Sequence, residues 1–457
     1  MTDTASNGSR LDASPMRVLI VAAHYPPVNS VAATRPAQWA RLLSQRGCVV
    51  SVLTTAIREG SLQGYDLTVP PGELIRVAVP GSRLIARLDS PFAEPGSGRG
   101  ERSQHRPGMI ARLTSWLRRS RGVFTSARMP DHHDLWMLAA LWRIRGRRWD
   151  VVISTHGPYA CHLVGYYLRR RGRARRWISD YRDLWVDNHI YPGLFPFTSL
   201  ERYLEAVFCH NADVITTVSD GLAARLASRH GRQVEVIHNT IDLDMWRHLD
   251  ATPAFPSDEC VRLVYTGTVY PVGQDPEILF RALALVRSRA PTEFARLRMV
   301  FAGKSQSSIR ELASHYGMTD ILDQPGQVSR DLALRMQRDA GVLIFFNFCA
   351  DGHAGILTSK LFEYLVSGTR ILSMGTKKDP STAAMLARSE RGLDFGDDVS
   401  ELAKEIERLA SHSATEEKYV LASTREFVDS ERCGDALYRL LGEQPDSLLR
   451  PDWMVRS

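Results

Sequence analysis

The chain alternates short apolar runs with helix-like segments, and this alternation occurs twice. In the first half, apolar runs at residues 16–25, 49–55 and 151–155 have the length of strands, and helical patterns separate them. After a proline-rich segment, the alternation begins again at residues 261–266. Strands that alternate with helices form parallel sheets covered by helices on both faces. The sequence therefore predicts an α/β protein with two Rossmann-like, doubly wound domains.

Composition places the boundaries of these domains. Residues 1–15 are small and polar, which predicts a disordered tail without a signal peptide, and no apolar run is long enough to span a membrane. We expect a first domain over 16–250 with a basic insertion at 81–130, a linker at 251–260 and a second domain over 261–425. We expect residues 426–457 to form a helical tail that returns to the first domain.

The composition also indicates the class of protein. The 457 residues are 44% apolar and 24% charged, which is ordinary for a soluble globular protein. Six cysteines are scattered without a Cys-x-x-Cys pair, and no Asp-x-Asp follows a predicted strand. Such cysteines are typical of reduced core residues. We therefore predict a cytoplasmic protein, and no spacing of cysteines with histidines indicates a bound metal or a cofactor.

One segment of the second half indicates a ligand site. The apolar strand at 341–348 leads through a polar loop into a helix that Thr358 or Ser359 begins and Gly368 ends. The first N–H groups of a helix lack partners within the helix and carry the positive end of its dipole. Such a strand, loop and helix unit therefore favours binding of a phosphate group.

Two charged residues lie on this helix at i,i+3 spacing. Lys360 falls in the first turn, where the helix dipole disfavours a cation, and a bound anion would relieve that conflict. Glu363 shares its face, so both side chains can address one bound molecule. The alternative is an ordinary surface pair of Lys360 and Glu363.

Polar residues also follow several other predicted strands. Ligands of open α/β sheets bind at the carboxyl ends of the strands, so these positions are candidates for a site. They are His156, Asp180, Arg182 and Asp183 in the first half, and Gly267, Thr268 and Lys304 in the second. A structural His156 and a surface Lys304 are the alternatives.

Residues 360–364, Lys-Leu-Phe-Glu-Tyr, resemble the donor-binding motif of family 4 retaining glycosyltransferases. That motif contains two glutamates separated by seven residues. Glu363 matches the second glutamate, which holds the ribose of the nucleotide, and Lys360 matches the basic residue near the diphosphate. Gly355 stands where the family has its first glutamate.

The resemblance extends over roughly residues 16–425, including 156–158 and 180–185, and implies the GT-B fold, with two domains facing a cleft. It implies an acceptor on the first domain and a nucleotide-sugar donor on the second, with retention of configuration and without a metal. The implied catalytic residues are His156, Asp180, Arg182 and Asp183. The implied donor-binding residues are Gly267, Thr268, Lys304, Leu357, Thr358, Ser359, Lys360 and Glu363.

Charge is distributed unevenly along the chain. Residues 1–250 carry 33 arginines, no lysine and 22 acidic residues, a net charge of +11, whereas the remainder carries 25 basic and 29 acidic residues. Residues 109–119 place Trp116 and Leu117 on one helical stripe with arginines beside it. A basic amphipathic helix of this kind is typical of membrane-surface binding, although such stripes also pack against their own domain.

These patterns predict a glycosyltransferase that binds the inner face of the cytoplasmic membrane peripherally. Its expected partners are a nucleotide-sugar, a lipid-linked or surface-glycan acceptor, and anionic lipid. A nucleotide-sugar epimerase of the same architecture is one alternative. An arginine-rich scaffold or RNA-binding protein is another, but the arginine runs lack the interleaved aromatics of RNA-binding modules, so no nucleic acid is expected.

Overall fold

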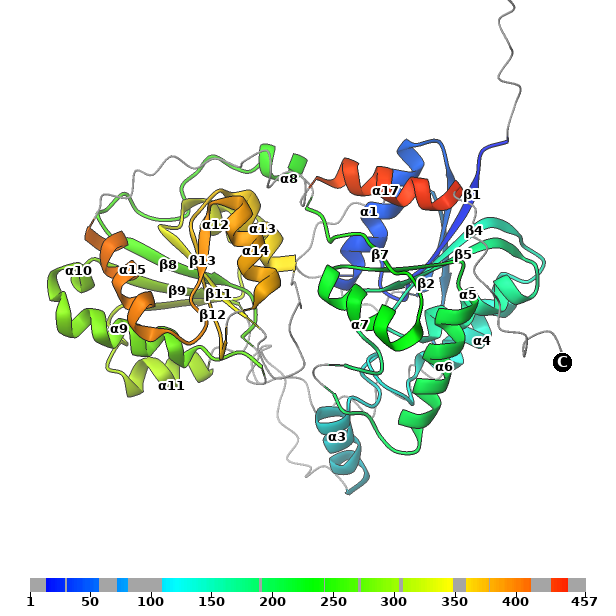
Figure 1. The fold of residues 1–457 in the computed structure, drawn as a ribbon, viewed down its shortest axis with the longest axis horizontal. Coiled ribbons are helices and arrows are strands. Elements are labelled where there is room, and N and C mark those ends of the chain that lie inside the picture. Colours follow the sequence, from blue (N-terminus) through cyan, green and yellow to red (C-terminus); the bar gives the residue numbers. More distant parts are fainter. Residues whose placement is uncertain are drawn as a thin grey trace, which may run out of the picture.

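Two parallel β-sheets organise the chain, one in each half (Figure 1). This computed structural model describes residues 14–28, 31–56, 72–80, 109–188, 191–241, 243–269, 273–303, 307–347, 359–377, 379–411 and 429–442. No helix within these ranges has the length and apolarity that a membrane span needs. Because the strands of both sheets pair in parallel, the predicted fold class of two doubly wound α/β domains is confirmed.

The first sheet has seven strands in the order β3-β2-β1-β4-β5-β6-β7. They are β1 Arg17–Val21, β2 Val49–Thr55, β3 Glu73–Val77, β4 Trp149–Thr155, β5 Ala174–Tyr181, β6 Val214–Thr217 and β7 Glu235–Val236. The chain builds outward from β1 to β3 and then returns to the other side of β1. The strand order therefore reverses between β1 and β4, and open α/β sheets bind ligands at such a point.

Helices cover both faces of this sheet. They are α1 Val31–Gln45, α4 His133–Arg143, α5 Ala160–Arg170, α6 Phe197–Asn211 and α7 Asp220–His230. A further helix, α3 Met109–Arg121, projects from one end of the domain (Figure 1). Val151 and Ile153 on β4 share a core with α1, whereas Val152 shares the opposite core with α4 and α5. Each such buried aliphatic side chain contributes about 1.5–3 kcal/mol, so both faces of the sheet stabilise the domain.

The second sheet has six strands in the order β10-β9-β8-β11-β12-β13. They are β8 Val261–Thr266, β9 Leu297–Ala302, β10 Leu322–Gly326, β11 Val342–Phe346, β12 Ile371–Met374 and β13 Gly392–Asp394. Its helices are α9 Glu277–Arg289, α10 Pro291–Ala295, α11 Ser307–His315, α12 Arg330–Asp339, α13 Ser359–Ser367, α14 Pro380–Ser389 and α15 Val399–Ser411. Here the order reverses between β8 and β11, and α13 is the helix that follows β11.

The chain passes from the first domain to the second earlier than the sequence pattern predicts. Ile237 belongs to a core of the first domain, but Ile241 already belongs to a core of the second. The short helix α8 Leu243–Arg247 contacts α13, and Trp246 packs against the same core. These apolar side chains therefore attach Ile241 and Trp246 to the core of the second domain, whereas the sequence pattern places the boundary at residue 250.

The proline-rich segment expected to be a linker is docked on α12. Asp339 accepts a hydrogen bond from the Ala254 N–H at 2.8 Å, and Arg338 donates to the Asp250 carbonyl oxygen at 2.6 Å. Arg335 donates to the carbonyl oxygen of Thr252 at 3.0 Å. The beginning of the segment, from Asp250 to Ala254, is therefore held by one helix.

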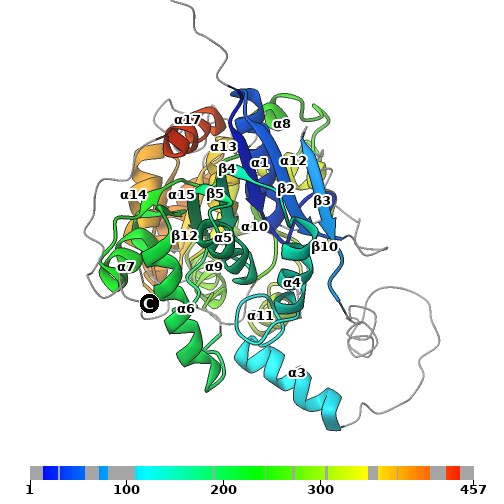
Figure 2. The ribbon, with the colours of Figure 1, turned by 90° about the vertical axis from the view of Figure 1, so that its right-hand side faces the viewer.

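The last described helix, α17 Ser430–Gly442, lies on the first domain. Figure 2 shows it beside α1, and Leu437 belongs to the same core as α1. Arg46, just after α1, pairs with Asp435 at 2.6 Å and Glu431 at 3.1 Å. The helix at the end of the described chain therefore strengthens the domain that the chain builds first.

Candidate functional site

Polar residues of both domains gather where the strand order of each sheet reverses. His24 follows β1, His156 follows β4 and Arg182 follows β5. In the second domain Gly267 follows β8, and α13, which carries Lys360, follows β11. Both groups therefore lie at the sheet edges where ligands of α/β proteins bind.

Lys360 lies in the first turn of α13 and packs against the end of β8. Its Nζ is 3.7 Å from the centroid of the Tyr265 ring. Burial lowers the pKa of the Lys360 ammonium to about 7, and the charge of Glu363 opposes this shift only in part. A Cβ on Gly267, whose φ is +122°, would lie 3.0 Å from Nζ. Only glycine therefore suits the position beside the lysine.

The ends of β8 and β9 approach each other closely behind Lys360. A Cβ on Gly303 would lie 2.0 Å from the carbonyl oxygen of Gly267, so this contact requires a glycine. The Tyr265 hydroxyl donates a hydrogen bond to the Thr268 carbonyl oxygen at 2.8 Å. Thr268 thereby fixes the ring on which Lys360 rests.

Glu363, one turn after Lys360, is held by two side chains of α12. Arg330 Nη2 donates to its Oε1 at 2.6 Å, and Gln337 Nε2 donates to its Oε2 at 3.3 Å. The alternative of an ordinary surface pair with Lys360 therefore does not describe Glu363, because its carboxylate forms an ion pair with Arg330. The sequence pattern did not mark Arg330 or Gln337, since both reach the helix from a distant segment.

His156 is buried, with 3% of its surface exposed. Its ring stacks on Tyr181 and on His162, with centroids 6.1 Å and 5.9 Å away. Burial holds the pKa of His156 well below 6.5, and the charge of Arg182 adds to this effect. Its Nε2 has no hydrogen-bond partner among the described residues. A buried nitrogen without a partner can accept or donate one further hydrogen bond.

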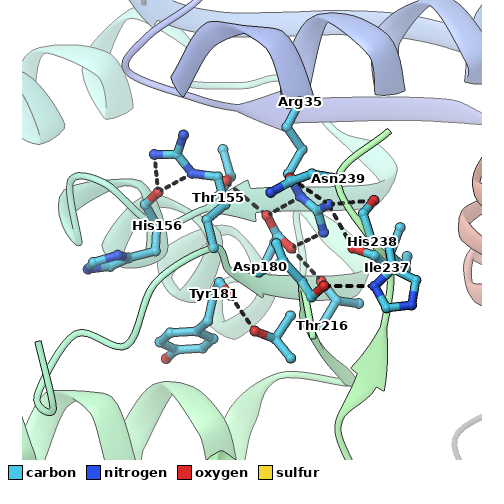
Figure 3. Close-up of polar contacts among 12 residues, drawn as sticks. Arg35, Thr155, His156, Asp180, Tyr181, Thr216, Ile237, His238 and Asn239 are labelled. Carbon is cyan, nitrogen blue, oxygen red and sulfur yellow. Dashed lines mark hydrogen bonds and ion pairs between the residues drawn. The ribbon is translucent and has the colours of Figure 1, made fainter. Parts of the chain in front are cut away.

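Asp180, expected among the catalytic residues, is bound by side chains of its own domain. It is fully buried, and Arg35 binds both carboxylate oxygens, with Nη2 at 2.8 Å and Nε at 3.2 Å (Figure 3). The hydroxyls of Thr155 and Thr216 each donate to it at 2.9 Å. Its acceptor positions are thus filled by the protein, so Asp180 fixes the positions of Arg35, Thr155 and Thr216.

Arg182 joins three elements at the carboxyl edge of the first sheet. Its Nε and Nη2 donate to the His156 carbonyl oxygen at 3.0 and 2.7 Å, and its Nη1 donates to the Ala32 carbonyl oxygen at 3.1 Å. Pro36 has no N–H, so the Ala32 carbonyl four residues earlier lacks its helical donor and is available to Arg182. Asp183, by contrast, is exposed beyond the strand end.

Arg35 connects this edge to the segment that enters the second domain. Its Nη1 donates to the carbonyl oxygens of Ile237 at 2.7 Å and His238 at 3.2 Å (Figure 3). The His238 ring in turn lies 6.2 Å from the ring of Phe362 on α13. The Arg35–Asp180 pair is therefore linked through one segment to the helix that carries Lys360 and Glu363.

A group of histidines that the sequence pattern did not mark lies at the same edge of the first domain. Asp131, His132 and His133 form the group of described residues whose ligand atoms could hold a metal ion. The Asp131 carboxylate is already occupied, since it accepts from His133 Nδ1 at 2.5 Å and from the Ser126 N–H at 2.8 Å. His24 lies 6.2 Å from His133, and burial lowers its pKa to about 4. The Asp131 carboxylate therefore orients the ring of His133. This arrangement resembles an oriented histidine more than an open metal site.

Some of the predicted donor-binding residues lie outside the described part of the chain. They are Lys304, Leu357 and Thr358, together with the side chain of Ser359, whose backbone begins α13. Gly355, at the position of the family's first glutamate, also lies outside it.

Comparisons with known proteins agree with this arrangement. Residues 32–245 match the model of Glycosyltransferase Family 4. No curated protein matches the chain in sequence. Its structure is similar to that of a sucrose-phosphate synthase from Thermosynechococcus elongatus, with a TM-score of 0.56, 15% identity, and coverage of 93% of this chain and 96% of that one.

Two further solved structures share the fold. A lipopolysaccharide outer core galactosyltransferase has a TM-score of 0.53 and 11% identity, over 93% of this chain and 99% of that one. A trehalose-6-phosphate protein from E. coli, bound with UDP-2-fluoro glucose, has a TM-score of 0.57 and 10% identity, over 93% and 98%. At these identities the likeness shows the GT-B fold alone. Together with the family match, it identifies the chain as a glycosyltransferase of the GT-B fold whose residues 32–245 match the Glycosyltransferase Family 4 model.

Proposed function

We propose that the protein transfers a sugar, with retention and without a catalytic metal, from a nucleotide-diphosphate-sugar to a lipid-linked or surface-glycan acceptor. The observation that carries this proposal is the pair of side chains on α13. The amino group of Lys360 lies against the end of β8, and the carboxylate of Glu363 is oriented one turn later on the same helix. A diphosphate beside Lys360 and a nucleoside beside Glu363 would use both groups.

The catalytic groups proposed for the first domain are His156 and Arg182, with Asp183 at the exposed end of the same loop. His156 offers a neutral imidazole with an unpaired nitrogen among the described residues. Arg182 binds the backbone carbonyl of His156, and Asp180 binds the hydroxyl of Thr155, which ends β4 just before His156. In such a site the developing charge on the leaving diphosphate would be stabilised by Lys360 and the start of α13.

We also propose that the enzyme works as a peripheral protein at the inner face of the cytoplasmic membrane. Of the twelve large apolar side chains that are exposed in the described ranges, nine lie between residues 113 and 203. They are Leu113, Trp116, Phe124, Leu135, Leu138, Trp142, Phe195, Leu200 and Tyr203. Figures 1 and 2 both show α3 projecting from one end of the first domain. Exposed apolar side chains beside arginines are typical of a surface that binds anionic lipid.

The test of the proposed chemistry is a panel of nucleotide-sugars incubated with the intact protein without acceptor. We expect slow release of one nucleoside diphosphate, in the presence of excess EDTA as well as in its absence. Loss of this activity in EDTA, restored by Mg²⁺ or Mn²⁺, would contradict the metal-free mechanism and direct attention to Asp131 and His133. Conversion of the donor sugar without release of nucleoside diphosphate would favour the epimerase alternative.

A further inference from the structure

A carboxylate holds the ring of His133 in one orientation at the start of α4. Asp131 Oδ1 accepts hydrogen bonds from His133 Nδ1 at 2.5 Å and from the His133 N–H at 2.9 Å, and Asp131 Oδ2 accepts from the Ser126 N–H at 2.8 Å. Burial alone would raise the pKa of Asp131, but the hydrogen bond and the charge of His133 lower it. An ionised carboxylate only accepts hydrogen bonds, so His133 Nδ1 carries the hydrogen of this pair.

The other nitrogen of the same ring is available for a further hydrogen bond. Among the described residues, the hydrogen bonds of His133 all involve its Nδ1 or its backbone N–H, although only 4% of the residue is exposed. The ring of Trp136 lies edge-on to His133, with centroids 6.3 Å apart, and the fully buried Nε1 of Trp136 also has no partner in the described chain. The ring of His132, 4.0 Å from that of His133, is 26% exposed, so the group opens to the surface. Both unpartnered nitrogens can bind a polar group of a ligand.

The charges around this ring favour a ligand without charge. His24 packs edge-on against His133 at 6.2 Å, and burial, helped by the charge of Arg182, lowers the pKa of His24 to about 4, so that its ring is neutral. The guanidinium of Arg182 is directed to backbone carbonyl oxygens, and Asp131 is itself negative. An anion would therefore be repelled, whereas a hydroxyl group can donate to an unprotonated Nε2 of His133 or accept from a protonated one.

We infer that Asp131 and His133 form a binding subsite for the acceptor, in which His133 Nε2 binds a hydroxyl group of a neutral sugar. Asp131 is in this arrangement a positioning residue, because it acts by orienting the ring of His133. The inference rests on the proposed function and narrows its acceptor. The part of the acceptor that enters this edge of the first sheet is a sugar ring, and the phosphate of any lipid carrier lies outside the subsite.

The test measures nucleotide release from the donor found with the panel of nucleotide-sugars, in excess EDTA and with different acceptors. Octyl glucoside, octyl galactoside and octyl mannoside offer neutral sugars, and farnesyl phosphate offers a phosphate on a lipid. We expect at least one octyl glycoside to accelerate release by the wild type and farnesyl phosphate to have no effect. His133→Phe should raise the KM of that glycoside about tenfold, as the loss of one hydrogen bond predicts, and should keep the affinity for the nucleoside diphosphate.

Conservative variants separate binding of the acceptor from folding of the domain. His133→Gln places an amide near the position of the ring nitrogens and should restore part of the loss. Asp131→Asn should also raise the KM of the glycoside, because the amide no longer selects one tautomer of His133. The matched control is His210→Phe, which removes an exposed histidine of α6 and should keep the wild-type KM.

An unchanged KM in both His133→Phe and Asp131→Asn would overturn the inference. Acceleration by farnesyl phosphate alone, or by none of the four acceptors, would overturn it as well. A melting temperature and a nucleotide affinity that fall together with acceptor use would show that His133 only stabilises the domain. Absence of nucleotide release from every donor, with or without acceptor, would overturn the proposed function and this inference with it.

Discussion

Lys360 gives the proposed donor site a dependence on pH. Its ammonium has a pKa of about 7 because burial leaves it poorly hydrated. A bound diphosphate favours the charged form and raises this pKa, so above pH 7 binding requires the uptake of a proton. The contribution of Lys360 to diphosphate affinity is therefore fully present below pH 7, and it falls as the pH rises through that value.

We expect the affinity for a nucleoside diphosphate to fall by up to about tenfold per pH unit above pH 7.5, where the phosphate itself is ionised. Calorimetry in buffers of different ionisation enthalpy would measure the accompanying proton uptake. Lys360→Met should bind weakly and without this dependence. Lys404→Met, which removes an exposed lysine paired with Glu401, is the matched control. An unchanged wild-type affinity across this range would argue against contact between Lys360 and the diphosphate.

His156 is expected to affect the rate more than the binding of the donor. If its ring assists proton transfer or positions the reacting groups, His156→Ala should lower kcat by roughly 10²-fold. Because burial holds its pKa well below 6.5, the wild-type rate should show no loss from His156 protonation between pH 6 and 8. The control is His210→Ala, which removes an exposed histidine of α6. A melting temperature that falls in parallel with the rate would instead support a structural histidine.

At the scale of the element, the Arg35–Asp180 pair joins α1, β5 and the segment that enters the second domain. Breaking a buried ion pair from one side leaves a charge without its partner and costs about 3–5 kcal/mol. Arg35→Met should therefore lower the free energy of unfolding of the first domain by about this amount. The double variant Arg35→Met/Asp180→Asn should recover part of it, because no unpaired charge remains.

Urea unfolding followed by the fluorescence of the buried Trp177 and Trp185 would measure this change in the first domain. Thr198→Val, a change within α6 away from the ion pair, is a suitable control. The variants should keep donor binding, since the pair lies in the other domain. A loss of catalysis in Asp180→Asn without a loss of stability would restore the expectation that Asp180 acts on the substrate.

Elements whose pattern is local could be predicted from the sequence, and those set by distant contacts could not. β8 runs from Val261 to Thr266 as predicted, because its apolar run is bounded on both sides. β10, Leu322–Gly326, was not predicted, since its sequence contains a proline and a glycine and it pairs only at the edge of the sheet. The packing of Ile241 in a core of the second domain was not predicted, because residues far away in sequence bury it.

The residues of the candidate site divide in the same way, into those that a local pattern indicates and those that distant contacts bring in. The face shared by Lys360 and Glu363 is a property of one helix, and the spacing indicates it directly. Arg330 and Gln337 come from α12, and nothing in their local pattern distinguishes them from other polar residues of an amphipathic helix. Asp180 was expected to contact substrate because it stands at a strand end, but its burial depends on Arg35, 145 residues earlier in the chain.

At the scale of the whole molecule, charge and exposed apolar surface coincide in the first domain. On α3, Leu113 and Trp116 are more than half exposed, and Arg112 and Arg118 are exposed beside them. The alternative that this stripe packs against its own domain does not hold for these side chains. Only one of the exposed large apolar side chains among the described residues, Leu393, lies in the second domain.

Membrane binding should therefore depend on α3 and on salt. Each arginine near an anionic surface contributes about 1 kcal/mol, and insertion of a tryptophan and a leucine adds an apolar component that salt does not screen. We expect the intact protein to co-sediment with phosphatidylglycerol vesicles at low salt and to be largely released at high salt. It should bind pure phosphatidylcholine vesicles weakly.

Two variants separate the charged from the apolar contribution to this binding. Replacing Arg112, Arg118, Arg119 and Arg121 by Gln should remove most binding at low salt, whereas Leu113→Ser/Trp116→Ser should remove the part that survives high salt. Leu393→Ser, on the other domain, should bind as the wild type does. If the wild type fails to bind anionic vesicles at low salt, or if all variants bind equally, then α3 is not a membrane surface. A soluble glycan would in that case be the better acceptor to test.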